Sequence, residues 1–167
     1  RLQLARRCPE LTVLPNSFDH SRFTPGPRPP ELLQRYRLQP QQPVILTLSR
    51  LSPFDRYKNI DGLILALPGL LQRWPDLRLM VAGEGADRGR LMQLAESQGL
   101  RDHVIFTGLL PAAELVAHYR LATIFALPSE KEGFGIVFLE AMGCGLPTLA
   151  GNRDGSCDPL ADGEFGL

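Results

Sequence analysis

The sequence has few cysteines and histidines, and its charges cancel. Three cysteines, Cys8, Cys144 and Cys157, are odd in number and show no Cys-x-x-Cys spacing, which argues against a zinc site or a disulfide framework and for a reducing compartment. Its three histidines are scattered, so we expect no metal site. Lys and Arg number 18, as do Asp and Glu. The sequence therefore lacks the basic field that nucleic acid binding needs.

Long hydrophobic runs are also absent. No apolar stretch approaches the roughly 20 residues of a membrane span, and the N-terminus has no signal-peptide pattern. The 167 residues, 44% of them hydrophobic, suffice for one globular domain with a sizeable core. We therefore expect a cytoplasmic location, which includes the inner face of the membrane.

Apolar runs alternate with helical patterns along the chain. Residues 44–48 form a continuous apolar run, typical of a strand buried on both faces of a parallel sheet. Further strands are expected at 77–82, 104–106, 122–127 and 148–150, and from Phe165 onward. Helices are expected at 31–38, from 59 or 60 to about 71 with a kink or early end at Pro68, at 87–98, at 112–120 and after residue 135. This alternation predicts an α/β fold with a doubly wound parallel sheet and right-handed crossovers.

The ends of the chain suggest a piece of a longer protein. Arg1 is not a starting methionine, and residues 166–167 look like the beginning of a strand. Residues 1–10 are interpreted as a linker or trailing helix, and residues 11–16 as a short strand that opens the domain. The proline-rich residues 25–30 are expected to form a loop.

A lone carboxylate stands out in the helix expected after residue 135. Glu140 lies between apolar neighbours on both sides in the sequence, Phe138-Leu139 and Ala141-Met142. Burying an unpaired carboxylate costs several kcal/mol, roughly 3–5 when a partner is removed, so Glu140 needs a partner or must face a polar cleft.

The start of the same helix has the features of an anion site. Gly133 and Gly135 flank Phe134 there, where free backbone N–H groups and the helix dipole can receive a phosphate and small residues allow close approach. Glu132 lies just before the helix and can point into the same mouth as Glu140. This combination suits a ligand with a phosphate at one end and hydroxyl groups beyond, such as a nucleotide sugar.

Two cations follow the first long strand. Arg50 and Lys58 lie past the carboxyl end of residues 44–48, the edge at which open α/β sheets bind ligands. An arginine fork and a mobile lysine together suit a diphosphate.

The stretch from Glu132 to Pro147 resembles the signature of a known family. Seven residues separate Glu132 from Glu140, in the fuller form Glu-Gly-Phe-Gly-x-x-x-x-Glu-Ala-Met-x-x-Gly-x-Pro. This is similar to the Glu-x7-Glu motif of retaining, GT-B-fold glycosyltransferases of the large group 1 (family 4) class. Ser49-Arg50-Leu51 with Lys58-Asn59 resembles the Gly-Arg-Leu and Lys-Gly/Asn element of that family, although Ser49 stands where the family usually has glycine.

The resemblance runs from about Val13 to Leu167 and covers only the C-terminal, nucleotide-binding half of the family. It implies that residues 11–167 are a donor-binding domain, incomplete at its C-terminus. It also implies a donor rather than a cofactor: a nucleoside-diphosphate sugar. Its sugar would pass with retention, usually without a metal, to a saccharide, lipid or small molecule held mainly by the protein's own N-terminal domain. That missing half would make any membrane contact, and the fragment alone would be inactive.

The resemblance also implies roles for individual residues. Arg50 and Lys58 would bind the diphosphate, and Glu132 would contact the donor sugar at the catalytic position. Glu140 would accept bonds from the ribose hydroxyls. Backbone groups would make the other contacts: those of Gly133, Phe134, Gly135 and Ile136 with phosphate or sugar, and those near Thr107, Gly108 and Leu109 with the base. Glu132 is not named a nucleophile, because a front-face route assisted by the leaving phosphate needs none.

Simpler interpretations stand beside these. Arg50 and Lys58 would ordinarily be solvated surface charges, and Glu140 could be a structural acid paired with Arg153. The Gly-x-Gly at Gly83 suggests a dinucleotide-binding oxidoreductase, but the third glycine position of that motif is occupied by Arg88. A non-catalytic nucleotide-binding domain of the same fold is the other alternative.

Overall fold

The computed structural model describes residue 14 and residues 16–167. The expected linker or trailing helix over residues 1–10 lies outside these described residues, as do most residues of the expected strand at 11–16.

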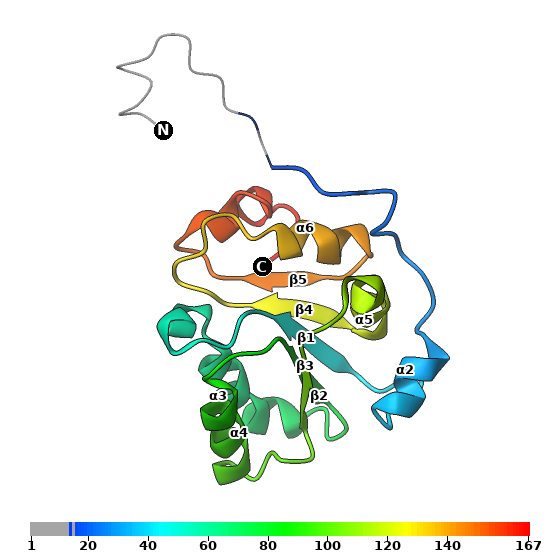
Figure 1. Ribbon diagram of the computed structural model, residues 1–167, viewed down its shortest axis with the longest axis vertical. Coiled ribbons are helices and arrows are strands. Elements are labelled where there is room, and N and C mark those ends of the chain that lie inside the picture. Colours follow the sequence, from blue (N-terminus) through cyan, green and yellow to red (C-terminus); the bar gives the residue numbers. More distant parts are fainter. Residues whose placement is uncertain (1–13, 15) are drawn as a thin grey trace.

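Five parallel strands form the sheet (Figure 1). They are β1 (Val44–Leu48), β2 (Arg78–Ala82), β3 (Val104–Gly108), β4 (Ile124–Leu127) and β5 (Thr148–Ala150). Their order across the sheet is β3-β2-β1-β4-β5, and every pair is parallel. The chain therefore winds outward from β1 to β3 and then returns to the other side of β1, which places a switch point between β1 and β4. The predicted α/β fold with a doubly wound parallel sheet is confirmed.

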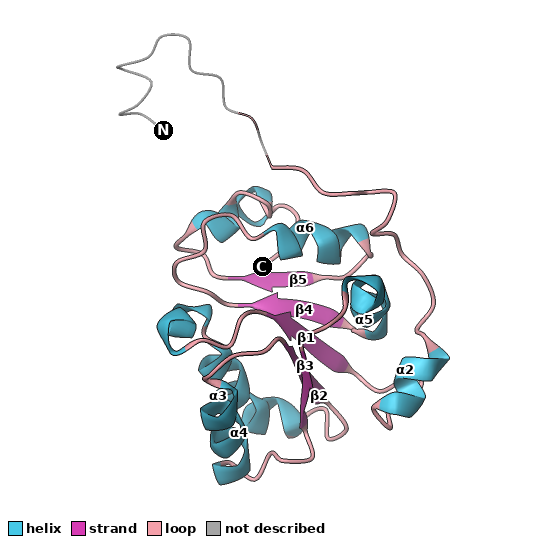
Figure 2. Cartoon of the chain, viewed as in Figure 1, coloured by secondary structure: helices cyan, strands magenta, loops and turns pink. Residues whose placement is uncertain are grey.

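Helices connect the strands and lie on both sides of the sheet (Figure 2). The α-helices are α2 (Pro30–Arg35), α3 (Ile60–Leu71), α4 (Arg88–Ser97), α5 (Leu115–Leu121) and α6 (Ile136–Gly143), and the 3-10 helices are η1 (Pro53–Lys58), η2 (Ala112–Glu114), η3 (Gly155–Cys157) and η4 (Ala161–Gly163). Because right-handed crossovers reverse face when the winding direction reverses, α3 and α4 lie on one face and α5 and α6 on the other. None of the described helices has both the length and the apolar character needed to span a bilayer.

A row of aromatic rings holds α6 to its face of the sheet. The rings of Tyr119, Phe125 and Phe138 are completely buried and meet edge to face, with centroids 5.8 Å apart in each step. Phe23 extends the row, its ring centroid 6.0 Å from that of Tyr119. Burying one such side chain contributes roughly 1.5–3 kcal/mol, so the row fixes the depth at which α6 sits.

The structure decides three expectations about element ends. Helix α2 ends at Arg35 rather than Leu38, because Arg37 adopts a left-handed conformation (φ 53°) and the Leu38 N–H turns back to the Leu33 carbonyl. Helix α3 runs from Ile60 to Leu71, the expected bounds, so Pro68 does not end it early; the exposed proline lies in the last turn. No strand begins at Phe165, but Leu167 exchanges two hydrogen bonds with the backbone of β5.

One face of the sheet carries an apolar hollow. Its volume is about 740 Å³, and it lies between α3 and strands β1, β4 and β5, lined among others by Ile45, Leu63, Ile124 and Leu149. Parallel sheets normally have both faces covered. Within residues 14 and 16–167, nothing covers this part of the face of β4 and β5.

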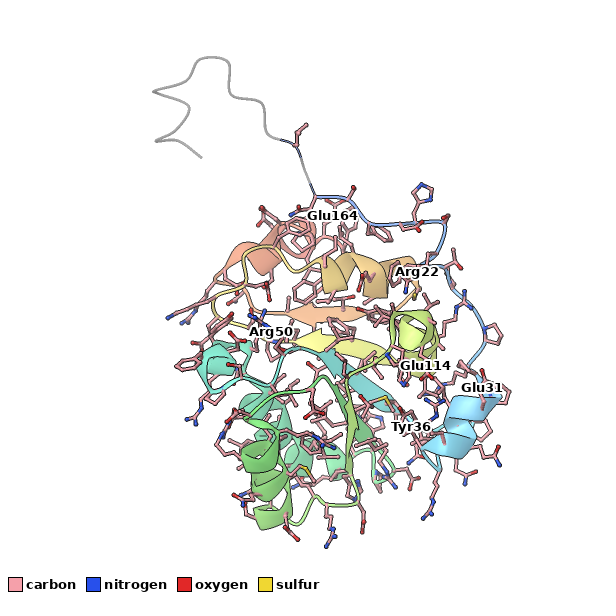
Figure 3. The ribbon with its side chains drawn as sticks, in the orientation of Figure 1. Arg22, Glu31, Tyr36, Arg50, Glu114 and Glu164 are labelled. Atoms are coloured by element: carbon pink, nitrogen blue, oxygen red, sulfur yellow. The ribbon has the colours of Figure 1, made fainter. Side chains whose placement is uncertain are left out.

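A buried histidine joins α2 to α5. His118 is completely buried, and its Nδ1 lies 2.8 Å from the Glu114 carbonyl, which can only accept, so the proton sits on Nδ1. Nε2 then accepts from the Tyr36 hydroxyl at 2.9 Å. Burial lowers the pKa of His118, although the Glu114 carbonyl and carboxylate act in the opposite direction and Arg35 adds to the lowering. Figure 3 shows Tyr36 and Glu114 on the facing elements.

This arrangement predicts a loss of stability in mild acid. The unfolded chain protonates His118 near its ordinary pKa of about 6.5, whereas the folded domain keeps it neutral to lower pH. The unfolding free energy should therefore be highest above pH 6.5 and fall below it, with a slope of at most about 1.4 kcal/mol per pH unit from this group. Denaturant titrations from pH 7.5 to 5 measure the slope.

His118→Gln should flatten that part of the profile. His20→Gln is the matched control, since His20 is exposed and lies outside the contact between α2 and α5. A slope that survives in His118→Gln would contradict the assignment.

Candidate functional site

The loop that carries Arg50 is held by two close backbone contacts. A Cβ on Gly83 (φ 141°) would lie 1.8 Å from the Ser49 carbonyl oxygen, and one on Gly85 (φ 153°) would lie 2.1 Å from that of Leu51. The Leu51 N–H donates to the Glu84 carbonyl at 3.0 Å. Both glycines are thus required by the approach of two neighbouring loops. This explains the Gly-x-Gly without a dinucleotide.

The loop that carries Glu132 is held in the same way. A Cβ on Gly151 would lie 1.8 Å from the Ser129 carbonyl oxygen, and one on Gly155 would lie 2.2 Å from that of Gly133. Ser129 follows β4 as Ser49 follows β1. The same close contact between a glycine and a carbonyl therefore occurs at two places on the sheet edge where the strands end, once after β1 and β2 and once after β4 and β5.

The structure brings Lys58 and Glu132 together. Lys58, the last residue of η1, donates from Nζ to Oε2 of Glu132, and both side chains are largely buried, at 16% and 15% exposed. The Glu130 N–H donates to the Tyr57 carbonyl at 2.9 Å beside this pair. The η1 segment and the loop before α6 thus form one wall of the site.

Arg50 lies at the same edge of the sheet but remains accessible (Figure 3). Its side chain is 81% exposed, and its guanidinium is 3.2 Å from the Asp55 carboxylate. Its partner Asp55 is only 11% exposed, so the Arg50 end of this pair faces solvent while the carboxylate end does not. Arg50 therefore presents an accessible cation at this edge of the sheet.

The two glycines at the start of α6 serve different needs. Gly135 has a φ of 80°, and a Cβ there would lie 2.4 Å from the Phe138 ring, so the fold itself requires this glycine. A Cβ on Gly133 would meet nothing within 4 Å. Phe134 is half-buried, and Ile136 is 38% exposed. The space in front of Gly133 is therefore open next to the backbone N–H groups of the first helical turn.

Glu140 lies farther along α6 and has a different partner from those weighed on sequence. Its Oε2 accepts a hydrogen bond from the Tyr119 hydroxyl at 2.9 Å, so the partner of Glu140 is Tyr119 and not Arg153. Burial raises the pKa of Glu140, while the bond from Tyr119 and the charge of Arg22 act against the rise. Arg22 lies at the opposite end of the sheet from Arg50 in Figure 3. Among the described residues, no hydrogen bond or ion pair joins Glu140 to the pair of Lys58 and Glu132.

The residues expected near a base lie at the end of β3. Gly108 (φ 74°) accepts at its carbonyl from the Gly83 N–H at 2.9 Å, and the Thr107 hydroxyl donates to the same carbonyl at 2.9 Å. Leu109 follows with 79% of its surface exposed. These residues border the Gly83 loop on the side away from Lys58.

Asp154 is the site residue that sequence reasoning missed. Its carboxylate accepts four hydrogen bonds: from the Ser129 hydroxyl (2.7 Å), the Glu132 N–H, the Ser156 N–H (3.0 Å) and the Ser156 hydroxyl. Burial raises its pKa, but these bonds outweigh burial and the pKa is lowered. The run Asp-Gly-Ser is a capping pattern visible in the sequence, and Asp154 caps η3.

A second charged cluster lies under the Arg50 loop. Arg90 bonds to Asp61 on α3 and to Asp87, whose Oδ2 is 2.6 Å away, and so ties α3 to α4. These bonds to Arg90 lower the pKa of both acids. In the described part of the chain, no group of three or more His, Cys, Asp or Glu side chains is placed to hold a metal ion.

Comparison with known proteins gives the family. Residues 30–167 match the family described as glycosyl transferases group 1. The chain belongs to this family. It is 40% identical over 164 residues to the GDP-mannose-dependent alpha-(1-6)-phosphatidylinositol monomannoside mannosyltransferase of Mycolicibacterium smegmatis, and covers 42% of that protein with 93% of its own length. The chain thus spans less than half of this relative.

Solved structures of glycosyltransferases share the fold. HepE of Anabaena in complex with UDP-glucose superposes with a TM-score of 0.75 at 28% identity, over 88% of this chain and 40% of that protein. The C-terminal domain of the group 1 glycosyltransferase LpcC of Francisella tularensis superposes with a TM-score of 0.65 at 26% identity, over 80% of this chain and 70% of that domain. This glycosyltransferase domain therefore corresponds to the C-terminal half of the GT-B fold.

The close contact at Gly83 predicts a large effect of one methyl group. Gly83→Ala should lower the unfolding free energy by well over 1 kcal/mol, because the Cβ overlaps the Ser49 carbonyl and φ is positive. Gly69→Ala in α3, where a Cβ meets nothing within 4 Å, should raise it by roughly 0.5–1 kcal/mol through helix propensity. Chemical denaturation of both variants tests this, and equal effects would contradict the contact.

Proposed function

We propose that this domain binds the nucleoside-diphosphate sugar donor of a retaining, metal-independent glycosyltransferase. The observation that carries the proposal is the pair of Lys58 and Glu132, which places a cation and an acid in front of Gly133 and the start of α6. A diphosphate needs the cation and the helix N-terminus, and a sugar offers hydroxyl groups to the acid.

In this proposal, the cations neutralise the departing diphosphate. As the bond to the anomeric carbon lengthens, negative charge gathers on the leaving phosphate oxygen, and Lys58, Arg50 and the first-turn N–H groups of α6 stabilise it. Both cations hold carboxylates in the structure, Glu132 and Asp55. The donor would replace these carboxylates, which frees Glu132 to accept bonds from the sugar.

The nucleoside would occupy the remaining edge. Glu140 would accept bonds from the ribose hydroxyls, and the backbone of Thr107, Gly108 and Leu109 would contact the base. Because Glu140 bonds to Tyr119 in the structure, one carboxylate oxygen is occupied and the other would serve the ribose. The base remains open, since the names of the relatives include both GDP-mannose and UDP-glucose.

The acceptor would be held mainly by an N-terminal domain of the same protein. Residues 11–167 would then be the donor half, with transfer in the cleft between the halves. The name of the mycobacterial relative includes phosphatidylinositol monomannoside, a lipid. An acceptor of that chemistry would place the enzyme in the cytoplasm, at the inner face of the membrane.

Calorimetric titration with UDP, GDP, ADP and NAD tests the donor site. One nucleoside diphosphate should bind, and Lys58→Ala should weaken it about tenfold or more through the lost charge-assisted bond, which alone corresponds to about 1.4 kcal/mol. Lys131→Ala is the matched control, because this neighbouring lysine is exposed. Binding of NAD alone, or equal losses in the two lysine variants, would overturn the proposal.

Gly133→Ala tests the approach of the ligand separately from the fold. Its Cβ meets no protein atom, so thermal unfolding should be unchanged, whereas a bound phosphate or sugar would be displaced and donor binding should weaken. Gly135→Ala should instead destabilise the domain, since the Cβ overlaps Phe138. Donor affinity unchanged in a folded Gly133→Ala protein would place the ligand elsewhere.

A further inference from the structure

We propose that Asp154 is a positioning residue for the glycosyl transfer, which holds the backbone at Glu132 and thereby sets the place of the pair of Lys58 and Glu132. This inference rests on the proposed function of that pair. Among the described residues no hydrogen bond joins the Asp154 carboxylate to either side chain of the pair, and its two contacts with the site loop are to the Ser129 hydroxyl and the Glu132 N–H.

The loop that Asp154 contacts has little conformational preference of its own. Residues 132–135 read Glu-Gly-Phe-Gly, and two glycines in four residues leave many backbone conformations open before folding. One backbone bond, from the Gly155 N–H to the Glu132 carbonyl at 2.8 Å, joins this loop to the one after β5. Asp154 adds the bond on the other side of the same residue, from the Glu132 N–H. Both backbone groups of Glu132 are therefore fixed by residues 154 and 155.

The two carboxylate oxygens divide the work. Oδ2 accepts from the Ser129 hydroxyl and the Glu132 N–H, which belong to the site loop, whereas Oδ1 accepts from the N–H and hydroxyl of Ser156, which belong to its own loop. Ser129 and Ser156 are 1% and 0% exposed, so water cannot replace the bonds to their hydroxyls. The carboxylate thus joins two loops that already meet where Gly151 approaches the Ser129 carbonyl and Gly155 approaches the Gly133 carbonyl.

An ionised acid suits this set of bonds. Each carboxylate oxygen faces one backbone N–H, of Glu132 or of Ser156, which can only donate, and a carboxylate is the side chain of this size with two oxygens that only accept. In Asp154→Asn the amide would have to point its own N–H groups at two of the donors. The lowered pKa of Asp154 agrees with a carboxylate that stays ionised.

Steady-state kinetics of the full-length enzyme with its nucleotide-sugar donor test the inference. Asp154→Asn should lower kcat about 10- to 100-fold with a smaller change in KM, because Glu132 is misplaced while Arg50 still meets the diphosphate. Glu132→Gln should lower kcat by itself, and Asp154→Asn should add little in that background if it acts through Glu132. Full additivity would overturn the positioning role.

Two further measurements keep the result interpretable. Ser156→Ala removes a bond on Oδ1 only, so it should lower stability but leave kcat within a few-fold of the wild type. Amide hydrogen exchange in Asp154→Asn should become faster at residues 129–133 and not across the sheet. Uniformly faster exchange would mean that Asp154 contributes only to the overall stability of the domain. Wild-type enzyme that neither binds nor transfers a nucleotide sugar would refute the proposed function, and normal wild-type transfer with an unaffected Asp154→Asn would refute this inference alone.

Discussion

At two points on the edge of the sheet a glycine lies so close to the carbonyl of a serine that no side chain fits between the loops. These contacts, Gly83 with Ser49 and Gly151 with Ser129, continue the strand pairing beyond the last ladder bonds of β1 with β2 and β4 with β5. Each fixes the start of the loop that carries a charged residue of the site. The whole arrangement of Arg50, Lys58 and Glu132 depends on them.

The site these loops build has its charges already paired. Lys58 and Glu132 form a largely buried pair, whose separation would leave an uncompensated charge. In the second pair only Arg50 is exposed, since its partner Asp55 is 11% exposed. In the proposed function, the donor would supply its diphosphate charge to Lys58 and a sugar hydroxyl group to Glu132 together.

The rest of the fold keeps α6 in register with that edge. The ring of Phe138 in α6 packs on Phe125, which packs in turn on Tyr119. The Tyr119 hydroxyl also donates to Glu140 of the same helix. The lone carboxylate of the helix is thereby tied to the aromatic row rather than to the cluster at the helix start. The bond from the Tyr119 hydroxyl explains how this acid can sit in an apolar helix.

The local sequence pattern was enough to determine the alternation of strands and helices, the parallel sheet, the group 1 motif and the ends of β1 and α6. These features depend on hydrophobic periodicity, apolar runs and helix-ending glycines, all of which act within a few residues. The pattern did not determine that Arg37 ends α2, nor which groups meet in space. Lys58 meets Glu132 across 74 positions, Tyr119 rather than Arg153 meets Glu140, and Asp154 reaches Glu132 across 22. Such pairings follow from which strands lie side by side, and only the order β3-β2-β1-β4-β5, set by the burial of the whole sheet, decides that.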